Sequence, residues 1–173
     1  ETMKTVRHIL LVCALALTAM LAGGCGIYSF SGTSIQPDVK SITINYFEYK
    51  AEKVNPSLSN QISEELRTQF RKMTRLEQVD IDGDLEISGE ITGYNVSAAA
   101  VTANEVAARN RLTVTVKISF TNRLYPEDDL EQSFSAYEEY DSMQSLDAVQ
   151  DALCVEIVKK LVEDIFNATV AQW

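Results

Sequence analysis

The sequence predicts an α+β fold, a two-layer sandwich in which two helices pack on one face of a four-stranded mixed sheet. Strict alternation of apolar and polar residues over 111–121 is typical of a strand with one buried face. Apolar residues recur at three- and four-residue steps over 57–76 and over 146–168, which indicates two amphipathic helices. A length of 173 residues with 46% hydrophobic and 23% charged residues supports a single globular domain. The expected order of elements is β-α-β-β-β-α.

The first strand and the first helix are predicted from two different periods. Over 41–49, one face carries Ile42, Ile44 and Tyr46, and the second, partly apolar face carries Thr43, Asn45 and Phe47, which is typical of a half-buried strand. Asn55 and Ser57 are the candidate N-caps of the helix over 57–76. Its expected core face consists of Leu58, Ile62, Leu66, Phe70 and Met73.

Three further strands and a second helix follow. The strands are expected over 85–96, 111–121 and 131–140, and short connections favour an antiparallel meander. The first strand joins this meander through the helical crossover, which makes the sheet mixed. The second helix is expected over 146–168 with Ser145 as its N-cap. The uncovered face of the sheet would carry Arg111, Thr113, Thr115 and Lys117 and would face water or a partner.

The N-terminal region has the pattern of a secretory signal. Lys4 and Arg7 precede an apolar run over 9–21, which is too short to span a bilayer. Small residues then lead into Cys25, a pattern similar to a bacterial lipobox, although Ala22 stands where leucine is usual. We therefore expect a signal peptide over 1–24, a lipidated Cys25 with a tether over 25–40, and one domain over 41–173. The alternative is a soluble periplasmic protein cleaved nearby.

Charge and residue types exclude several functions. The chain has 15 basic and 25 acidic residues, and removal of residues 1–24 leaves 13 basic and 24 acidic residues, a net charge of −11. Nucleic acid is therefore an unfavoured partner. The sole histidine, His8, departs with the signal, so histidine-dependent catalysis and histidine-ligated zinc are excluded from the mature chain. Cys154 remains beside the apolar stripe of the second helix without a cysteine partner, and we expect no disulfide, metal or cofactor.

Several segments together resemble the LptE family of lipopolysaccharide-assembly lipoproteins. They are Cys25–Gly32, Lys40–Ile44, Met73–Leu76, Gly83–Leu85 and Asn110–Leu112. The resemblance implies a non-enzymatic lipoprotein, anchored through Cys25 at the periplasmic face of the outer membrane, that plugs and supports the LptD β-barrel. It also implies assistance in delivering lipopolysaccharide to the outer leaflet. Another envelope lipoprotein adaptor, such as a transporter auxiliary protein, is the alternative, and a membrane-tethered hydrolase is the least favoured.

Basic residues are scarce and are therefore candidate anion sites. Arg109, Arg111 and Lys117 lie at and beyond the start of the third strand, and guanidinium groups bind phosphates such as those of lipid A bidentately. The alternative for these residues is cross-strand pairing with Glu86 or Glu90.

A second group of basic residues lies on the first helix. Arg67, Arg71 and Arg75 recur every four residues and predict an outward basic stripe, which forms local ion pairs or contacts an anion.

Three other motifs carry weaker functional hypotheses. Residues 80–86 are acidic but lack the glycine and glutamate spacing of an EF-hand, so they indicate a polar turn. Glu138 and Glu139 are adjacent in a strand and would face opposite sides, which excludes a paired-acid site. Asp141-Ser142-Met143 resembles an O-glycosylation acceptor at Ser142.

Overall fold

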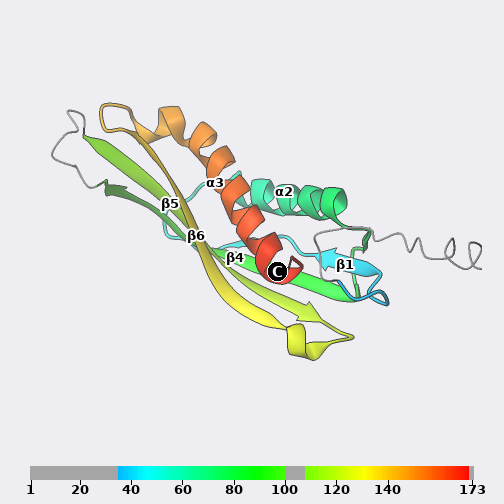
Figure 1. Cartoon of the computed structure of the whole chain (residues 1–173). Helices are drawn as coiled ribbons and strands as arrows, with labels where there is room; N and C mark the ends of the chain where they lie inside the picture. Colours follow the sequence, from blue (N-terminus) through cyan, green and yellow to red (C-terminus); the bar gives the residue numbers. More distant parts are fainter. Residues whose placement is uncertain (1–34, 100–107, 172–173) are drawn as a thin grey trace, which may run out of the picture. The chain divides into compact units, whose positions relative to one another are not determined.

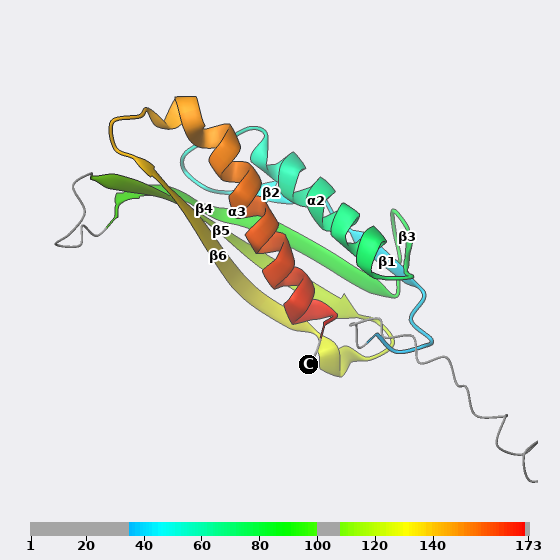
Figure 2. The ribbon, with the colours of Figure 1, turned by 45° about the horizontal axis from the view of Figure 1, so that its top comes forward.

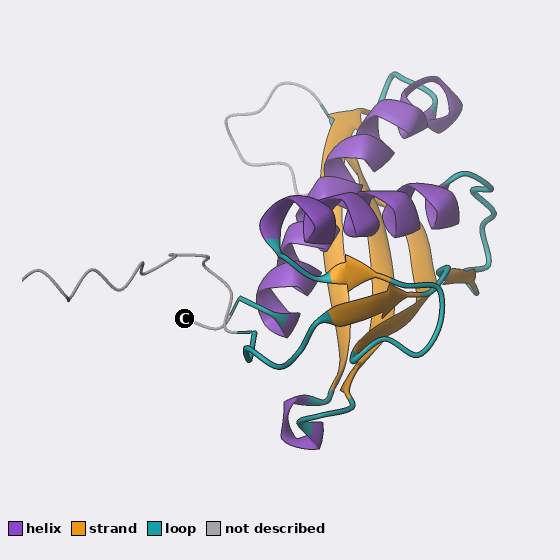
Figure 3. Cartoon of the chain, turned by 90° about the vertical axis from the view of Figure 1, so that its right-hand side faces the viewer, coloured by secondary structure: helices purple, strands orange, loops and turns teal. Residues whose placement is uncertain are grey.

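A mixed sheet with two helices on one of its faces forms the domain, as Figures 1 and 3 show. The computed structural model describes residues 35–99 and 108–171. The sheet has six strands rather than the predicted four, in the order β3-β1-β4-β5-β6, with β2 pairing with β4 outside this path. None of the helices in the described part of the chain has the length and apolar composition of a membrane span.

The elements have the following bounds along the chain. The strands are β1 (Ser41–Ile44), β2 (Glu48–Tyr49), β3 (Glu77–Gln78), β4 (Leu85–Ala98), β5 (Arg109–Asn122) and β6 (Leu130–Asp141). The helices are α2 (Leu58–Met73) and α3 (Leu146–Thr169), and a short 3-10 helix, η1 (Pro126–Asp128), lies between β5 and β6.

The predicted antiparallel meander is confirmed in β4, β5 and β6. Both pairs are antiparallel along nearly their full length, with a bulge between Ile91 and Gly93. The apolar side chains of β5 point toward the helices and are buried, because alternate residues of a strand face opposite sides. These buried residues are Leu112, Val114, Val116, Ile118 and Phe120.

The predicted strand over 41–49 is two strands, β1 and β2, both parallel to β4. Between them the backbone turns Phe47 into the core, where its side chain is fully buried. The Phe47 N–H donates to Ser63 Oγ of α2 at 3.0 Å, and its ring occupies the space over Gly89. The insertion of this ring explains why one continuous strand does not form.

β3 is not predicted by the sequence pattern. This strand has only two residues, directly after α2, and it pairs in parallel with β1. Glu77 N–H donates to Lys40 O at 2.9 Å and Val79 N–H donates to Ile42 O at 3.0 Å. Two residues are too few to show an alternation of apolar and polar side chains, so this strand is recognised only from its backbone hydrogen bonds.

The two helices bury their apolar stripes against the sheet and against each other. Phe70 of α2 and Phe166 of α3 meet edge to face with ring centroids 5.0 Å apart. Met73, expected on the core face, is 52% exposed, because α2 ends at this residue. Thr74 follows, and its Oγ1 donates to the last-turn carbonyl of Phe70 at 2.7 Å.

Candidate functional site

Arg109 and Arg111 lie at the start of β5, at the end of the sheet where β4 ends, and we call this place the arginine end. Both side chains point to the face of the sheet away from the helices, where they meet Glu139 of β6. Arg111 donates from Nε and Nη2 to Glu139 Oε1 at 3.2 and 2.7 Å. Its guanidinium also stacks over the Tyr137 ring at 4.0 Å from the centroid. The arginine end is therefore ordered by one carboxylate and one aromatic ring.

The two arginines differ in how freely they can bind an anion. Arg111 is firmly held, and its hydrogen bond with Glu139 raises the pKa of the guanidinium. Arg109 makes only a 3.7 Å contact with Glu139, and 47% of its side chain is exposed. Arg109 therefore has more donors available to an anion than its neighbour Arg111 on the same face, because a guanidinium has donors left after one loose ion pair.

The third predicted site residue, Lys117, lies elsewhere on the same face. It is eight positions along β5 from Arg109, a separation of about 27 Å at the rise of an antiparallel strand. Its ammonium pairs with Glu131, and this hydrogen bond raises the pKa of Lys117, with a smaller contribution from Glu90 across β4. The structure thus joins Arg109 and Arg111 in one site and leaves Lys117 outside it.

Cross-strand pairing occurs: Glu90 lies opposite Lys117, as the sequence-based alternative allows, but the ion pairs of these three basic residues are with Glu131 and Glu139 of β6. Glu86, one expected partner, forms an ion pair with Arg123 at 3.1 Å instead. Arg109 and Arg111 of β5 pair with Glu139 of β6. Glu138 points the other way and pairs with Lys160 of α3 at 2.6 Å. The two adjacent glutamates therefore face opposite sides, as predicted.

Two arginines of the predicted outward basic stripe on α2, Arg67 and Arg71, contact the neighbouring edge of the sheet. Arg67 Nη2 donates to Ile44 O at 2.8 Å, and Nη1 pairs with Glu64 at 2.5 Å. Arg71 Nη2 donates to Gln78 Oε1 of β3 at 3.2 Å. These arginines close the edge of the sheet beside β1 and β3.

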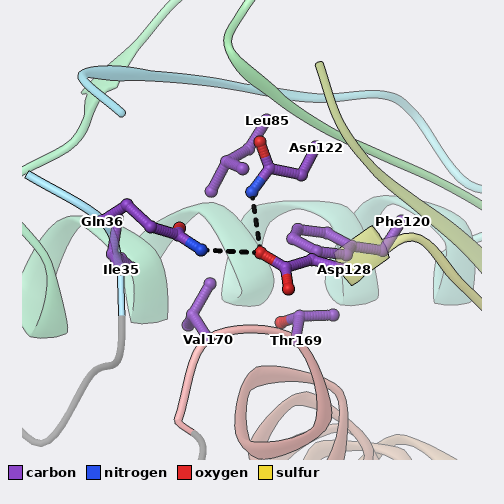
Figure 4. A pocket seen from close by; sticks show the side chains of 8 residues that line it. All are labelled: Ile35, Gln36, Leu85, Phe120, Asn122, Asp128, Thr169 and Val170. Carbon is purple, nitrogen blue, oxygen red and sulfur yellow. Dashed lines mark hydrogen bonds between the residues drawn. The ribbon is translucent and has the colours of Figure 1, made fainter. Parts of the chain in front are cut away.

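The opposite end of the sheet holds the beginning of the described chain, and we call it the tether end. Gln36 Nε2 and Asn122 Nδ2 both donate to Asp128 Oδ2, at 2.8 and 3.1 Å (Figure 4). A cavity of about 80 Å³ lies beside this cluster, against Thr169 and Val170 at the end of α3. Residues 35–40 are thus attached to the turn between β5 and β6, and β5 separates this attachment from the arginine end by about 44 Å.

The acidic turn over 80–86 has a structural role at the tether end. Asp84 accepts the backbone N–H of Lys40 at 2.8 Å and that of Ser41 at 3.0 Å. These hydrogen bonds, the one from Lys40 first, lower the pKa of Asp84. Within the described residues, no three His, Cys, Asp or Glu side chains converge as metal ligands.

Replacing this carboxylate, Asp84→Asn, should lower the melting temperature at pH 7. Because the folded pKa is depressed, the carboxylate stabilises the fold above its unfolded pKa of about 3.9, and this contribution is lost as the pH falls through the folded value. The difference in melting temperature between wild type and variant should therefore shrink at pH 3. Asp80→Asn, an exposed change in the same turn, is the control and should shift melting by less than about 2 °C. A constant difference from pH 7 to pH 3 would contradict this role.

Cys154 of α3 belongs to a buried polar cluster with Asn55, just before α2, and Tyr94 of β4. Asn55 Nδ2 lies 3.5 Å from both Cys154 Sγ and the Tyr94 hydroxyl. Burial raises the pKa of the Cys154 thiol, and burial likewise raises the pKa of Tyr94 to about 12. A neutral, enclosed thiol is a weak nucleophile, which fits a packing role.

Comparison with known families identifies the chain. The model of the family described as LptE, lipopolysaccharide-assembly, matches residues 39–169. The chain belongs to the LptE family. This span includes every described strand and helix, and it contains the arginine end.

LptE membership confirms the resemblance seen in the sequence. It makes the chain a member of a lipopolysaccharide-assembly family of the bacterial envelope, and this family is not one of enzymes. No curated protein sequence matches the chain significantly. Cys25 lies outside the described residues, so lipidation of this LptE-family chain stays a prediction.

Solved structures are similar to this LptE-family chain at low sequence identity. A hypothetical protein from Chlamydia trachomatis is similar with a TM-score of 0.52 and 11% identity, over 73% of this chain and 92% of that one. A minor lipoprotein from Acinetobacter baumannii has a TM-score of 0.44 and 11% identity, over 69% of this chain and 89% of that one. Lipoprotein B from Nitrosomonas europaea has a TM-score of 0.44 and 13% identity, over 76% and 85%. The first of these supports the α+β architecture alone.

The arginines of this site are predictable from the sequence, but the two residues that hold Arg111 in place were not predicted. Tyr137 and Glu139 become partners of Arg111 because β5 and β6 form a hairpin in which Arg111 lies opposite Glu139. The alternation of both strands contained this signal, since residues equally far from the turn face each other.

Proposed function

We propose that this chain is an outer-membrane lipoprotein that braces an LptD-like β-barrel and assists lipopolysaccharide transport to the outer leaflet. Residues 1–24 are the signal peptide, Cys25 carries the lipid at the periplasmic face, and a tether over 25–40 leads to the domain over 41–173. The observation that carries the proposal is the LptE family match over residues 39–169.

The uncovered face of the sheet is suited to a polar barrel interior. Its side chains are mostly hydroxyls and paired charges, and Thr115 and Ser135 hydrogen bond across β5 and β6 at 2.8 Å. The lumen of an outer-membrane barrel is polar, whereas its lipid-facing side is apolar. A face of this kind is compatible with water-filled surroundings and incompatible with lipid.

The arginine end is the proposed contact with lipopolysaccharide. Its two guanidinium groups stand on a mature chain of net charge −11, so a phosphate group would be attracted there and repelled by much of the remaining surface. Arg109 supplies the more exposed donors, and Arg111 is fixed beside it by Glu139 and Tyr137.

The partner is tested by purifying tagged protein from detergent-solubilised outer membranes and identifying what accompanies it. A large β-barrel in near-stoichiometric amount is the expected result. Recovery with an inner-membrane or periplasmic complex, and no barrel, would overturn the proposal in favour of a transporter auxiliary lipoprotein.

The lipid contact is tested with Arg109→Glu plus Arg111→Glu. Reversing both charges should weaken lipopolysaccharide binding by the purified protein at least about tenfold, because two phosphate-binding groups become repulsive. Binding is measured at two salt concentrations, and a thermal melt checks that the variant folds. The matched control is Lys50→Glu plus Lys53→Glu, which changes the net charge equally between β2 and α2. Equal binding by the folded arginine variant and the control would exclude the site.

A further inference from the structure

One long edge of the sheet is open in the described part of the chain. β6 is the last strand in the order β3-β1-β4-β5-β6, and its 12 residues pair with β5 on one side only (Figures 1 and 2). Among residues 35–99 and 108–171, no strand pairs with its other side. Unpaired edges of this length are templates for the addition of another strand.

The hydrogen bonds at the ends of the ladder show which groups of β6 face outward. Ser142 N–H donates to Ala108 O at 3.1 Å, so even-numbered positions of this strand bond to β5. Odd-numbered residues from 131 to 139 therefore direct their N–H and C=O groups to the open edge. Tyr137 confirms this, because its carbonyl accepts a hydrogen bond from Lys160 Nζ of α3 at 3.1 Å.

A groove of about 340 Å³ runs between this edge and α3. Its lining residues are Ser135, Ala136, Tyr137, Lys160, Glu163 and Asp164. Lys160 is neutralised by Glu138 at 2.6 Å. Within the described chain, neither carboxylate of the helix side, Glu163 or Asp164, has an ion-pair partner. The groove thus combines outward backbone groups, of which the Tyr137 carbonyl is already bonded to Lys160, with two carboxylates that have no ion-pair partner in the described chain.

We propose that the open edge of β6 binds an extended segment of another protein, which adds to the sheet as a strand and carries lysine or arginine on alternate residues. Main-chain hydrogen bonds to the odd-numbered residues of β6 supply affinity, and side chains on alternate positions supply specificity. Residues of the added strand that face the helices meet Glu163 and Asp164, which select positive charge. This surface is distinct from the arginine end and goes beyond the proposed function.

A second copy of the chain fits this edge poorly. Antiparallel pairing of two β6 strands centred on Ser135 would place Glu131 of one copy opposite Glu139 of the other. Like charges directly opposite each other destabilise a strand pair. Both glutamates have a cation partner within their own chain, which weakens this repulsion. A second copy is disfavoured further because β6 contains no lysine or arginine to place against Glu163 and Asp164, whereas a basic segment does.

The test uses the full mature protein in detergent and a seven-residue peptide of alternating lysine and threonine with blocked ends. At millimolar peptide, amide hydrogen exchange at Ser133, Ser135 and Tyr137 should slow at least about fivefold, because their N–H groups become hydrogen bonded. The same peptide with glutamate in place of lysine should give no protection. No protection by the lysine peptide, or equal protection by both peptides, would overturn the proposal.

Two variants separate the backbone contribution from the charge contribution. Ser135→Pro removes one outward N–H of β6 and keeps the hydrogen bonds between β6 and β5. Glu163→Lys plus Asp164→Lys reverses the charge of the groove. Each variant should abolish the protection from exchange at the remaining edge amides. Asp151→Lys, earlier on the exposed side of α3, is the charge control and should keep the protection. Protection that persists in the folded Glu163→Lys plus Asp164→Lys variant would refute the charge selection. Protection that rises with protein concentration without peptide would instead indicate a second copy.

Discussion

Phe70→Ala is expected to lower the free energy of unfolding by about 3–5 kcal/mol. Phe70 is fully buried where α2 meets α3, and its ring contacts that of Phe166 edge to face. Truncation removes this aromatic contact and leaves a cavity that the two helices and the sheet cannot close without moving. Urea denaturation measures the effect as a lower midpoint at an unchanged slope.

Met73→Ala is the matched control for this prediction. Met73 lies one turn further along α2, but half of it is exposed, so its truncation should change stability by less than about 0.5 kcal/mol. Equal losses in the two variants would mean that the helix layer is not packed as described.

Gly83→Ala is expected to destabilise the domain by about 1–3 kcal/mol or more. A Cβ at this position would lie 2.6 Å from Thr43 N, 2.8 Å from Ile42 C and 2.8 Å from Leu85 O. All three are backbone atoms, so no side chain can move aside, and β1 and β4 must separate where they begin to pair. The same shift would strain the 3.0 Å hydrogen bond from Gly83 N–H to Thr43 Oγ1.

Gly93→Ala provides the comparison for this glycine. Its nearest neighbours are the side-chain atoms of Thr115, at 3.1 and 3.2 Å, and these can yield by a few tenths of an ångström. Thermal melts of both variants should therefore show a drop of several degrees for Gly83→Ala and a much smaller one for Gly93→Ala. The reverse order would contradict the close approach of the turn before β4 to β1.

The alternation of apolar and polar residues predicted those strands in which buried and exposed side chains alternate regularly along the whole strand. β5 is the clearest case, because a strand between two neighbours with one covered face must alternate strictly. Phe47 shows where the rule ends: the pattern over 41–49 assigned it to the second face, yet the break between β1 and β2 turns it inward. The Phe47 ring fills the space above Gly89, which lies about 40 residues further along the chain. The apolar–polar pattern over 41–49 contains no information about that distant residue.

The candidate site was predictable in its residues and only partly in its contacts. Arg109 and Arg111 were predictable because basic residues are scarce in this chain, and in the structure both form an ion pair with the Glu139 carboxylate. Their partner is on β6 rather than β4, which depends on strand register. Lys117 was grouped with the two arginines because its side chain lies on the same face of the sheet, but it is too far along β5 to belong to the same site.

The position of β1 inside the sheet has a consequence for the order in which the chain folds. β1 leaves the ribosome early, yet it must insert between β3 and β4, and its residue Ile42 pairs with the much later Leu85. β4, β5 and β6 are consecutive hairpins whose loops close at low entropic cost, so we expect them to associate first. The earliest strand to be synthesised would then be among the last to dock, and its apolar residues would be open to chaperones during that interval.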